Sequence, residues 1–172
     1  SDIFSVGVTL FEMATGELPG RDRDALAIED LAKRELIAFA LRDDPSERPT
    51  ADELLDFVEE LADSTGRPVG IKSAIGLLGF WKDLADRMAS EDRGVDYIAV
   101  DGGEGGTGAA PFAFSDHVAL PFKVGFSRVY SIFAERGVHQ NVVWVGSGKL
   151  GFPETALMAF CLGLDMVAVG RE

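Results

Sequence analysis

The chain has 172 residues, of which 47% are apolar and 26% are charged, and its formal net charge is −13. This composition can bury a core and excludes a globally disordered chain. The strong negative charge argues against nucleic acid as a partner, because phosphate backbones repel it. No apolar run reaches the roughly 18 residues that a membrane span needs. The single cysteine, Cys161, excludes a disulfide framework and a zinc or iron–sulfur cluster held by this chain alone, and a reducing cytoplasm is the expected location.

The acidic charge is concentrated in the first 66 residues, which carry 17 acidic and 6 basic residues, against 12 and 10 in the rest. This uneven distribution indicates two pieces of different origin joined near Gly66. The first piece is expected to be helical. Asp2 can cap a buried helix that Gly16 and Pro19 end, and a second helical region covers about residues 24–41.

A third helix is predicted after Thr50. Thr50 and Glu53 have the spacing of a capping box, and apolar residues follow on one face. The expected face consists of Leu54, Leu55, Val58, Leu61 and Ala62. The helix should end at Gly66, since Pro68 follows shortly.

The first piece resembles the C-terminal lobe of a serine/threonine protein kinase. The resemblance rests on SDIFSVGVTLFEMATGELP and ALRDDPSERPTADELL and covers about residues 1–55. It implies that Asp2 and Arg48 are structural props, and Arg48 without its glutamate partner is expected to be solvated or locally paired. The nucleotide loop, the strand lysine and both essential aspartates of that family have no counterpart in this sequence, so kinase activity is not expected.

From Pro68 onward, short β-branched runs alternate with helical segments. The runs are PVGIKSAI, DYIAVDGG, NVVWVGSG and DMVAVGRE, and helices are predicted near residues 78–90, 123–136 and 153–162. Repeated βα units of this kind give a parallel sheet, either doubly wound or part of a (β/α) barrel. In both folds ligands gather at the C-terminal ends of the strands, where this sequence places its glycines.

The stretch DGGEGGTGAAP, residues 101–111, follows the second of these runs. Glycine loses much conformational entropy on folding, so a loop this rich in it suggests positive φ angles or backbone lying against a ligand. Glu104 and Thr107 are the side chains that the glycines frame. A flexible linker is the alternative, although linkers favour serine and do not adjoin a strand.

Two further strand ends suggest a phosphate site. Residues 146–149, Gly-Ser-Gly-Lys, offer backbone amides, a hydroxyl and an ammonium, and Gly170 with Arg171 places a guanidinium after the last strand. The first is not a Walker loop, because residue 143 is not glycine and no hydroxyl residue follows Lys149. Tight strand-to-helix turns without a ligand would use the same glycines, so that alternative stays open.

Lys72 lies on a strand that is otherwise built for burial, so it needs a partner. A ligand carboxylate or an electron-rich ring would supply one, and the alternative is a lysine that extends from the strand end to solvent. His117 is expected to be a hydrogen-bonded loop residue, and His139, in a polar turn, to be exposed.

Residues 53–172 resemble the FMN-binding synthase domain of glutamate synthase. The resemblance rests on LLDFVEELADSTGRPVGIKSAIG, VDYIAVDGGEGGTGAAPFAFSDHVALPF, VGSGKLGFP and VAVGRE. It implies a (β/α)8, or TIM, barrel that binds FMN and makes glutamate by reducing the imine formed from 2-oxoglutarate and ammonia. These four strands would then be the last four of the barrel.

The same resemblance implies the site residues. Lys72 would face the flavin or the 2-oxoacid and act in catalysis together with Glu104, and no metal site is expected. The implied cofactor-binding residues are Gly102, Gly103, Gly105, Gly106, Thr107, Gly146, Ser147, Gly148, Lys149, Gly170 and Arg171.

We therefore expect a chimera-like α/β protein with a kinase C-lobe-like all-α segment at residues 1–52 and four βα units, half of a parallel TIM barrel, at residues 53–172. A half barrel leaves strand edges unpaired and an inner face open, so either a second copy or the helical segment covers it, or the protein is only marginally stable. FMN binding is favoured over turnover, because positioning a flavin needs walls that the missing half supplies. The alternative is a non-enzymatic fusion or scaffold whose helices contact a partner protein.

Overall fold

The computed structural model describes residues 49–104 and 119–170. The helices are α3 (Ala51–Thr65), α4 (Gly79–Ser90), α6 (Phe122–Glu135), the 3₁₀ turn η3 (His139–Asn141) and α7 (Pro153–Cys161). The strands are β1 (Gly70–Ala74), β2 (Tyr97–Asp101), β3 (Val143–Ser147) and β4 (Met166–Val167). Predictions outside the described residues concern the kinase-like segment with Asp2 and Arg48, and also Gly105, Gly106, Thr107, His117 and Arg171.

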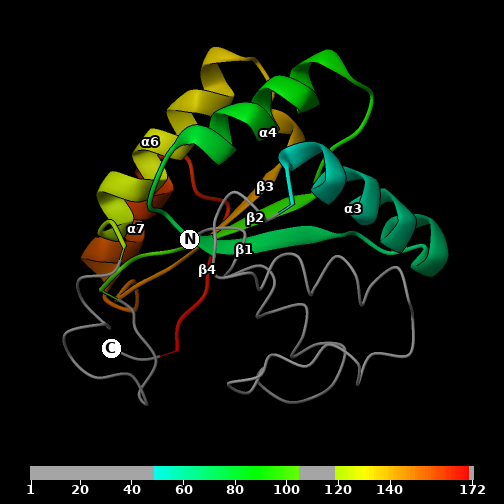
Figure 1. Ribbon diagram of the computed structural model, residues 1–172. Coiled ribbons are helices and arrows are strands. Elements are labelled where there is room, and N and C mark those ends of the chain that lie inside the picture. Colours follow the sequence, from blue (N-terminus) through cyan, green and yellow to red (C-terminus); the bar gives the residue numbers. More distant parts are fainter. Residues whose placement is uncertain (1–48, 105–118, 171–172) are drawn as a thin grey trace, which may run out of the picture.

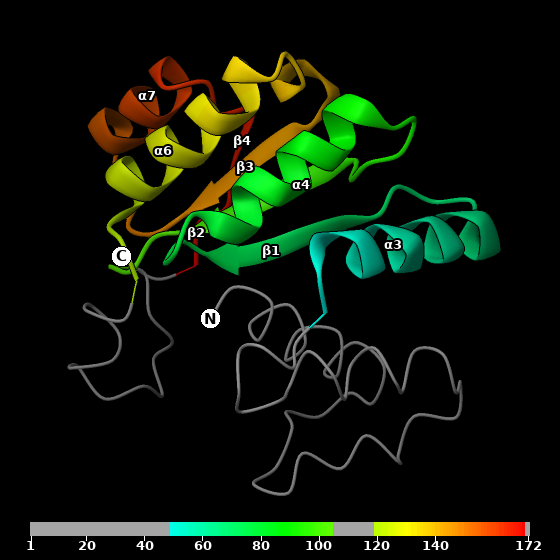
Figure 2. The ribbon, with the colours of Figure 1, turned by 45° about the horizontal axis from the view of Figure 1, so that its top comes forward.

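The four strands form one parallel sheet in the order β1-β2-β3-β4. Helices α3, α4, α6 and α7 all lie on the same side of it (Figures 1 and 2). A doubly wound sheet carries helices on both faces, whereas no helix of the described ranges covers the second face. The arrangement is therefore α/β, consistent with half of a (β/α) barrel.

The strands alternate between a face covered by helices and a face that these helices leave open. Ile71, Ile98 and Trp144 lie side by side in the register and are buried under the helices. Their neighbours along each strand point the other way, because successive side chains of a strand alternate. Lys72, Ala99 and other residues of that second set are half-buried or exposed. We call this second side the open face.

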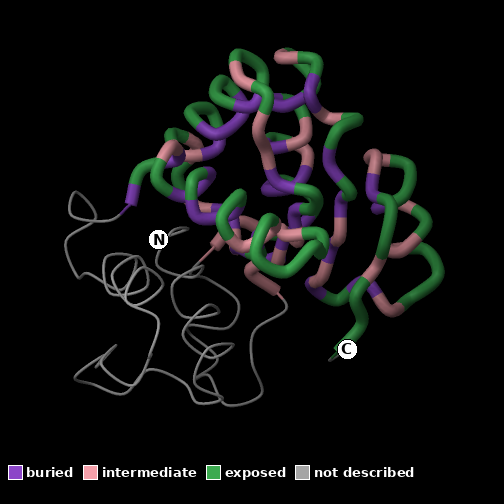
Figure 3. Tube along the Cα trace, turned by 90° about the vertical axis from the view of Figure 1, so that its right-hand side faces the viewer, coloured by how far each residue is buried: buried purple, intermediate pink, exposed green. Residues whose placement is uncertain are grey.

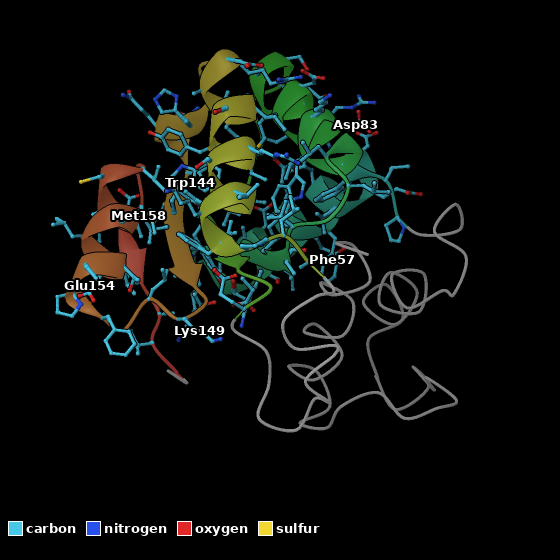
Figure 4. The ribbon with its side chains drawn as sticks, turned by 90° about the vertical axis from the view of Figure 1, so that its left-hand side faces the viewer. Phe57, Asp83, Trp144, Lys149, Glu154 and Met158 are labelled. Atoms are coloured by element: carbon cyan, nitrogen blue, oxygen red, sulfur yellow. The ribbon has the colours of Figure 1, made fainter. Side chains whose placement is uncertain are left out.

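The core between the sheet and α6 is centred on Trp144, whose side chain is 1% exposed. Its ring meets Phe126 and Phe133 edge-on, with ring centroids 5.7 and 5.2 Å apart. The indole Nε1 donates to the carbonyl oxygen of His139 at 2.9 Å, so the polar atom is satisfied. Figure 3 shows buried positions between the helices and the sheet, and Figure 4 shows Trp144 beside α6.

Helix α3 begins and ends as the sequence predicts. The Thr50 side chain accepts from the Glu53 amide at 3.3 Å, and the Glu53 carboxylate accepts from the Thr50 amide at 2.8 Å, which confirms the capping box. Gly66 ends the helix with φ of 62°, in the left-handed region that glycine tolerates. Leu54, Leu55 and others of the expected face are buried, and Leu61 and Ala62 are only half-buried.

Arg93 joins α3 to the chain that follows α4. Its guanidinium contacts the carboxylates of Asp52 and Asp56 on α3 and that of Glu91 beside it. Ala51 is also buried in the core that the sheet shares with its helices. The predicted boundary between residues 52 and 53 thus falls within the first turn of a helix that is packed and charge-paired against the βα units.

Two aspartates hold the N-terminal ends of neighbouring strands together. Asp96 accepts from the Val69 amide at 2.7 Å and donates its own amide to the Val69 carbonyl at 2.9 Å. Asp165 repeats this reciprocal pattern with Trp144, at 2.8 and 2.9 Å. Each aspartate therefore fixes the register of one parallel pair directly before its own strand, β2 or β4, begins.

Within residues 49–104 and 119–170, the predicted elements agree with the structure apart from two details. The fourth strand is only Met166–Val167, much shorter than the run DMVAVGRE suggested. His139 is half-buried rather than exposed, because its ring packs edge-on against Tyr130 at 5.4 Å and its Nδ1 is buried. Pro153 opens α7 as expected, and Gly163 follows it with φ of 110°.

Replacing Trp144 tests the centre of the core. Trp144→Ala should lower the free energy of unfolding by about 3–5 kcal/mol, since it leaves a cavity among three aromatic rings. Urea titration followed by circular dichroism measures the loss. Leu157, which is 65% exposed, is the control, and Leu157→Ala should change stability by no more than about 0.5 kcal/mol. Equal losses in the two variants would contradict this core.

Acid should weaken the ion pairs between helices. The hydrogen bond from Arg136 lowers the pKa of Asp86, and hydrogen bonds from Arg93 and Arg87 lower the pKa of Glu91. A carboxyl group whose pKa is lower when folded stabilises the protein above its unfolded pKa, and this stabilisation is lost as the pH falls through the folded value. The urea concentration at the unfolding midpoint should therefore decrease as the pH is lowered below about 4.5. Arg136→Met should flatten this fall, and an unchanged slope would contradict the assignment.

Candidate functional site

The C-terminal ends of β1, β2 and β3 are joined by backbone hydrogen bonds. The Gly102 amide donates to the Ser147 carbonyl at 2.8 Å, which extends the pairing of β2 with β3. The Gly103 amide donates to the Leu120 carbonyl at 2.9 Å, and the Leu120 amide donates to the Ile75 carbonyl at 2.9 Å. We call this the strand-end edge. It holds the first part of the glycine-rich stretch against the ends of two neighbouring strands.

Glu104 bonds to the start of α6. Both of its carboxylate oxygens accept from the Phe122 amide, at 3.0 and 2.8 Å. The first amides of a helix have no partner within the helix, and its N-terminus carries partial positive charge, so this carboxylate stabilises α6. The predicted catalytic role of Glu104 stays a prediction, and the observed contacts give it a structural one.

Gly102 and Gly103 have packing reasons to lack a side chain. A Cβ on Gly102 would lie 2.6 Å from the Glu104 carboxylate and 2.6 Å from the Phe122 Cβ. A Cβ on Gly103 would lie 2.4 Å from the carbonyl oxygen of Ala119. At these two positions the glycines let chain segments approach one another. Their predicted contact with a cofactor would have to come from backbone atoms.

The glycines at the end of β3 and just after it, Gly146 and Gly148, are equally constrained. A Cβ on Gly146 would meet the Phe122 ring at 2.6 Å, so this residue packs under the helices rather than on the open face. Gly148 has φ of 125°, and a Cβ on it would lie 3.0 Å from the Gly102 Cα. Lys149 follows with φ of 52°. Packing and turn geometry are sufficient reasons for these glycines, and their predicted contact with a phosphate stays a prediction.

Lys72 and Asp101 form an ion pair across β1 and β2. The Lys72 Nζ lies 2.9 Å from the Asp101 Oδ2, and the two side chains are 52% and 36% exposed. Both stand on the open face, close to the strand-end edge. The partner that Lys72 needed is thus a carboxylate of this chain. Sequence reasoning missed Asp101, although the parallel register of two runs with Lys72 and Asp101 on the same face carries the signal.

Ser147 is the next residue of the open face, paired with Asp101 in the register. Lys149 is exposed at the turn that follows (Figure 4). Beyond β4, Gly170 is exposed with open space around it. Because β3 and β4 are parallel neighbours, their chain continuations leave the sheet at the same edge. The convergence of Lys149 with Arg171, which lies outside the described residues, stays a prediction.

The described residues contain neither a metal-binding cluster nor a membrane span. No group of three or more His, Cys, Asp or Glu side chains in residues 49–104 and 119–170 is arranged to hold a metal ion. Within the same ranges, every helix is too short or too polar to cross a bilayer.

Comparison with known proteins gives a consistent result. Residues 47–172 match the family described as a conserved region in glutamate synthase. The chain is 35% identical over 119 residues to the glutamate synthase large subunit-like protein YerD of Bacillus subtilis, covering 69% of this chain and 23% of YerD. It is 31% identical over 121 residues to the archaeal glutamate synthase (NADPH) of Methanocaldococcus jannaschii, with the same coverage of 69% and 23%.

A third relative, the archaeal glutamate synthase (NADPH) of Archaeoglobus fulgidus, is 32% identical over 152 residues, which is 88% of this chain and 25% of the relative. A match of that length extends into the segment before residue 47. The chain thus spans about a quarter of the length of these relatives. The resemblance of the first segment to a kinase lobe stays a prediction.

Gly103→Ala tests whether packing explains the glycines of the strand-end edge. The added methyl meets a backbone oxygen that cannot rotate away, so the free energy of unfolding should fall by about 1–3 kcal/mol without any flavin present. Gly79, at the first residue of α4, has nothing within 4 Å of such a Cβ. Gly79→Ala should be neutral or stabilising by up to about 1 kcal/mol. If both variants unfold at the same urea concentration, packing does not require Gly103.

Proposed function

Because the chain belongs to the glutamate synthase family, through the conserved region at residues 47–172, we propose that it is part of an FMN-dependent oxidoreductase that converts 2-oxoglutarate to glutamate by reductive amination. The observation that carries this proposal is the match of that family over the whole described sheet and its strand-end edge. The chain spans about a quarter of the relatives' length. The role that we propose for this chain is therefore to bind cofactor and substrate, whereas catalytic turnover requires a completed barrel.

The residues after β3 and β4 fit the phosphate of FMN. Lys149 is an exposed cation, and Gly170 has open space around it. Backbone amides of a glycine-rich turn together with a cation form a suitable site for an anion. The proposed phosphate ligands are Gly146, Ser147, Gly148, Lys149, Gly170 and Arg171. Bound FMN would supply hydride or electron transfer to the substrate.

The glycine-rich stretch and Lys72 are proposed for the other end of the site. Residues 102–107 would follow the flavin and substrate side with backbone atoms. Lys72 stands on the open face, which is the interior in a complete barrel, and its ammonium would bind a carboxylate of the 2-oxoacid. For Glu104 we propose a positioning role, since its hydrogen bonds to the Phe122 amide hold the chain between Asp101 and α6.

A second copy of the chain is the proposed partner that completes the barrel. The edges formed by β1 and β4 have no neighbouring strand among the described residues. Met166 and Val169 are each 57% exposed near the β4 edge, and Leu157 on the adjacent α7 is 65% exposed. These exposed apolar residues also favour the alternative, in which the chain is a scaffold that contacts another protein. A cytoplasmic location remains part of the proposal.

Titration of the flavin-free chain with FMN, followed by quenching of flavin fluorescence, tests the proposed function. Lys149→Ala and Arg171→Ala should each weaken binding by about tenfold or more, because each removes a charge-assisted contact to phosphate. Arg128→Ala is the matched control. Arg128 is exposed along α6, so its loss should leave the affinity unchanged.

Two outcomes would count against this proposal. Equal affinities in all three variants would refute the phosphate assignment. A colourless chain that neither quenches FMN nor gains thermal stability from it would favour the scaffold instead.

A further inference from the structure

The Lys72–Asp101 pair offers opposite charges to a ligand at one point of the open face. The ammonium has three donors, and the Asp101 carboxylate has two oxygens, of which Oδ2 lies 2.9 Å from Nζ. Both side chains keep substantial contact with solvent. A ligand can therefore reach the ammonium and the carboxylate together without breaking the pair.

The side chains next to the pair in the register are small: two alanines and one serine. Ala99 is the register partner of Lys72, and Ala74 is the register partner of Asp101. Ser147, on the third strand, is level with Asp101. Neighbouring strands lie about 4.8 Å apart, so an ammonium, a carboxylate and a hydroxyl share a narrow strip beside two methyl groups. This leaves room for a small polar ligand.

The backbone holds both charges in place. Lys72 and Asp101 lie within the paired ladder of β1 and β2. The residue after Asp101, Gly102, is fixed by its hydrogen bond to Ser147 and by close contact with Phe122. Neither charge sits on a long loop, so the site is organised before a ligand arrives, which lowers the entropic cost of binding.

We propose that Lys72 and Asp101 together recognise a carboxylate and an adjacent cationic nitrogen, as found in an α-amino acid and in the protonated imine that precedes it. Lys72 binds the α-carboxylate, and Asp101 accepts a hydrogen bond from the nitrogen. This assignment rests on the proposed function for the identity of the ligand, glutamate. It adds Asp101 as a binding residue that selects for nitrogen.

The chemistry of imine formation explains what Asp101 contributes. The 2-oxoacid and ammonium give the protonated imine and one water: the C=O bond is replaced by C=N, the carbonyl oxygen leaves as water, and the positive charge passes from ammonium to the imine. A fixed carboxylate beside this carbon stabilises the cationic nitrogen. The same carboxylate repels the 2-oxoacid dianion, which brings no cation of its own.

The competing explanation is an ion pair that links two strands and has no role in binding a ligand. Pairs this exposed contribute little to stability. A structural pair would therefore bind neither compound selectively, and its loss would shift the urea midpoint at most slightly. The two explanations differ in how the affinities for an amino acid and for a 2-oxoacid respond to the loss of one charge.

The experiment measures binding of L-glutamate and of 2-oxoglutarate to the full chain, each by isothermal titration at millimolar concentrations. Asp101→Asn should weaken the binding of L-glutamate by about tenfold, since a charge-assisted hydrogen bond is lost. The same variant should bind 2-oxoglutarate more tightly, since the repulsion by the carboxylate is removed. Lys72→Met should weaken both. Asp83→Asn is the matched control: it removes the same charge from an exposed position on α4 (Figure 4) and should change neither affinity.

Opposite changes for the two ligands support the proposal. Changes of the same sign, equal effects of Asp83→Asn and Asp101→Asn, or no binding of either compound by the unaltered chain would overturn it. The FMN titration is separate, because it depends on Lys149 and Arg171. A chain that binds FMN but fails this test loses only the amino-acid assignment, and a chain that fails both loses the proposed function as well.

Discussion

The close approach of Gly102 to the start of α6 is the constraint on which the strand-end edge depends. Gly102 has no Cβ, so Phe122 and the Glu104 carboxylate can occupy the space beside it. Glu104 then bonds to the Phe122 amide, and the Gly102 amide bonds to Ser147. One missing side chain thereby lets two strands and a helix meet at a single point. The positions of Lys72 and Asp101 follow, because their strands are held in register up to this point.

Most of the described fold could be predicted from the sequence, because its signals are local. The capping box at Thr50 and the glycine at position 66 mark the two ends of one helix. The alternation of β-branched runs with helical segments predicted the parallel sheet. The two predictions that were wrong depend on tertiary contacts. His139 lies in a polar turn, yet the ring of Tyr130 covers it. The fourth run has valines at positions 167 and 169, but its ladder stops after Val167, and no local pattern marks that limit.

The candidate site was only partly predictable for the same reason. The glycine-rich motif indicated where the chain must pass closely against other atoms, but not that those atoms belong to Phe122 and Ala119. Lys72 was singled out as a charge that needs a partner, whereas Asp101 became visible only with the register. Resemblance to the glutamate synthase family supplied the cofactor and the reaction, which residue patterns alone could not name.

The short last strand has a consequence for how tightly any anion is held. Met166 and Val167 make only two register pairs with β3, so few backbone bonds oppose local opening, and such a segment is among the first to exchange its amide hydrogens. Gly170, a proposed phosphate ligand, lies three residues after Val167. Part of the interaction energy of a bound anion would then be used to order the segment after β4. The measured affinity would therefore depend on this ordering as well as on the contacts with the anion.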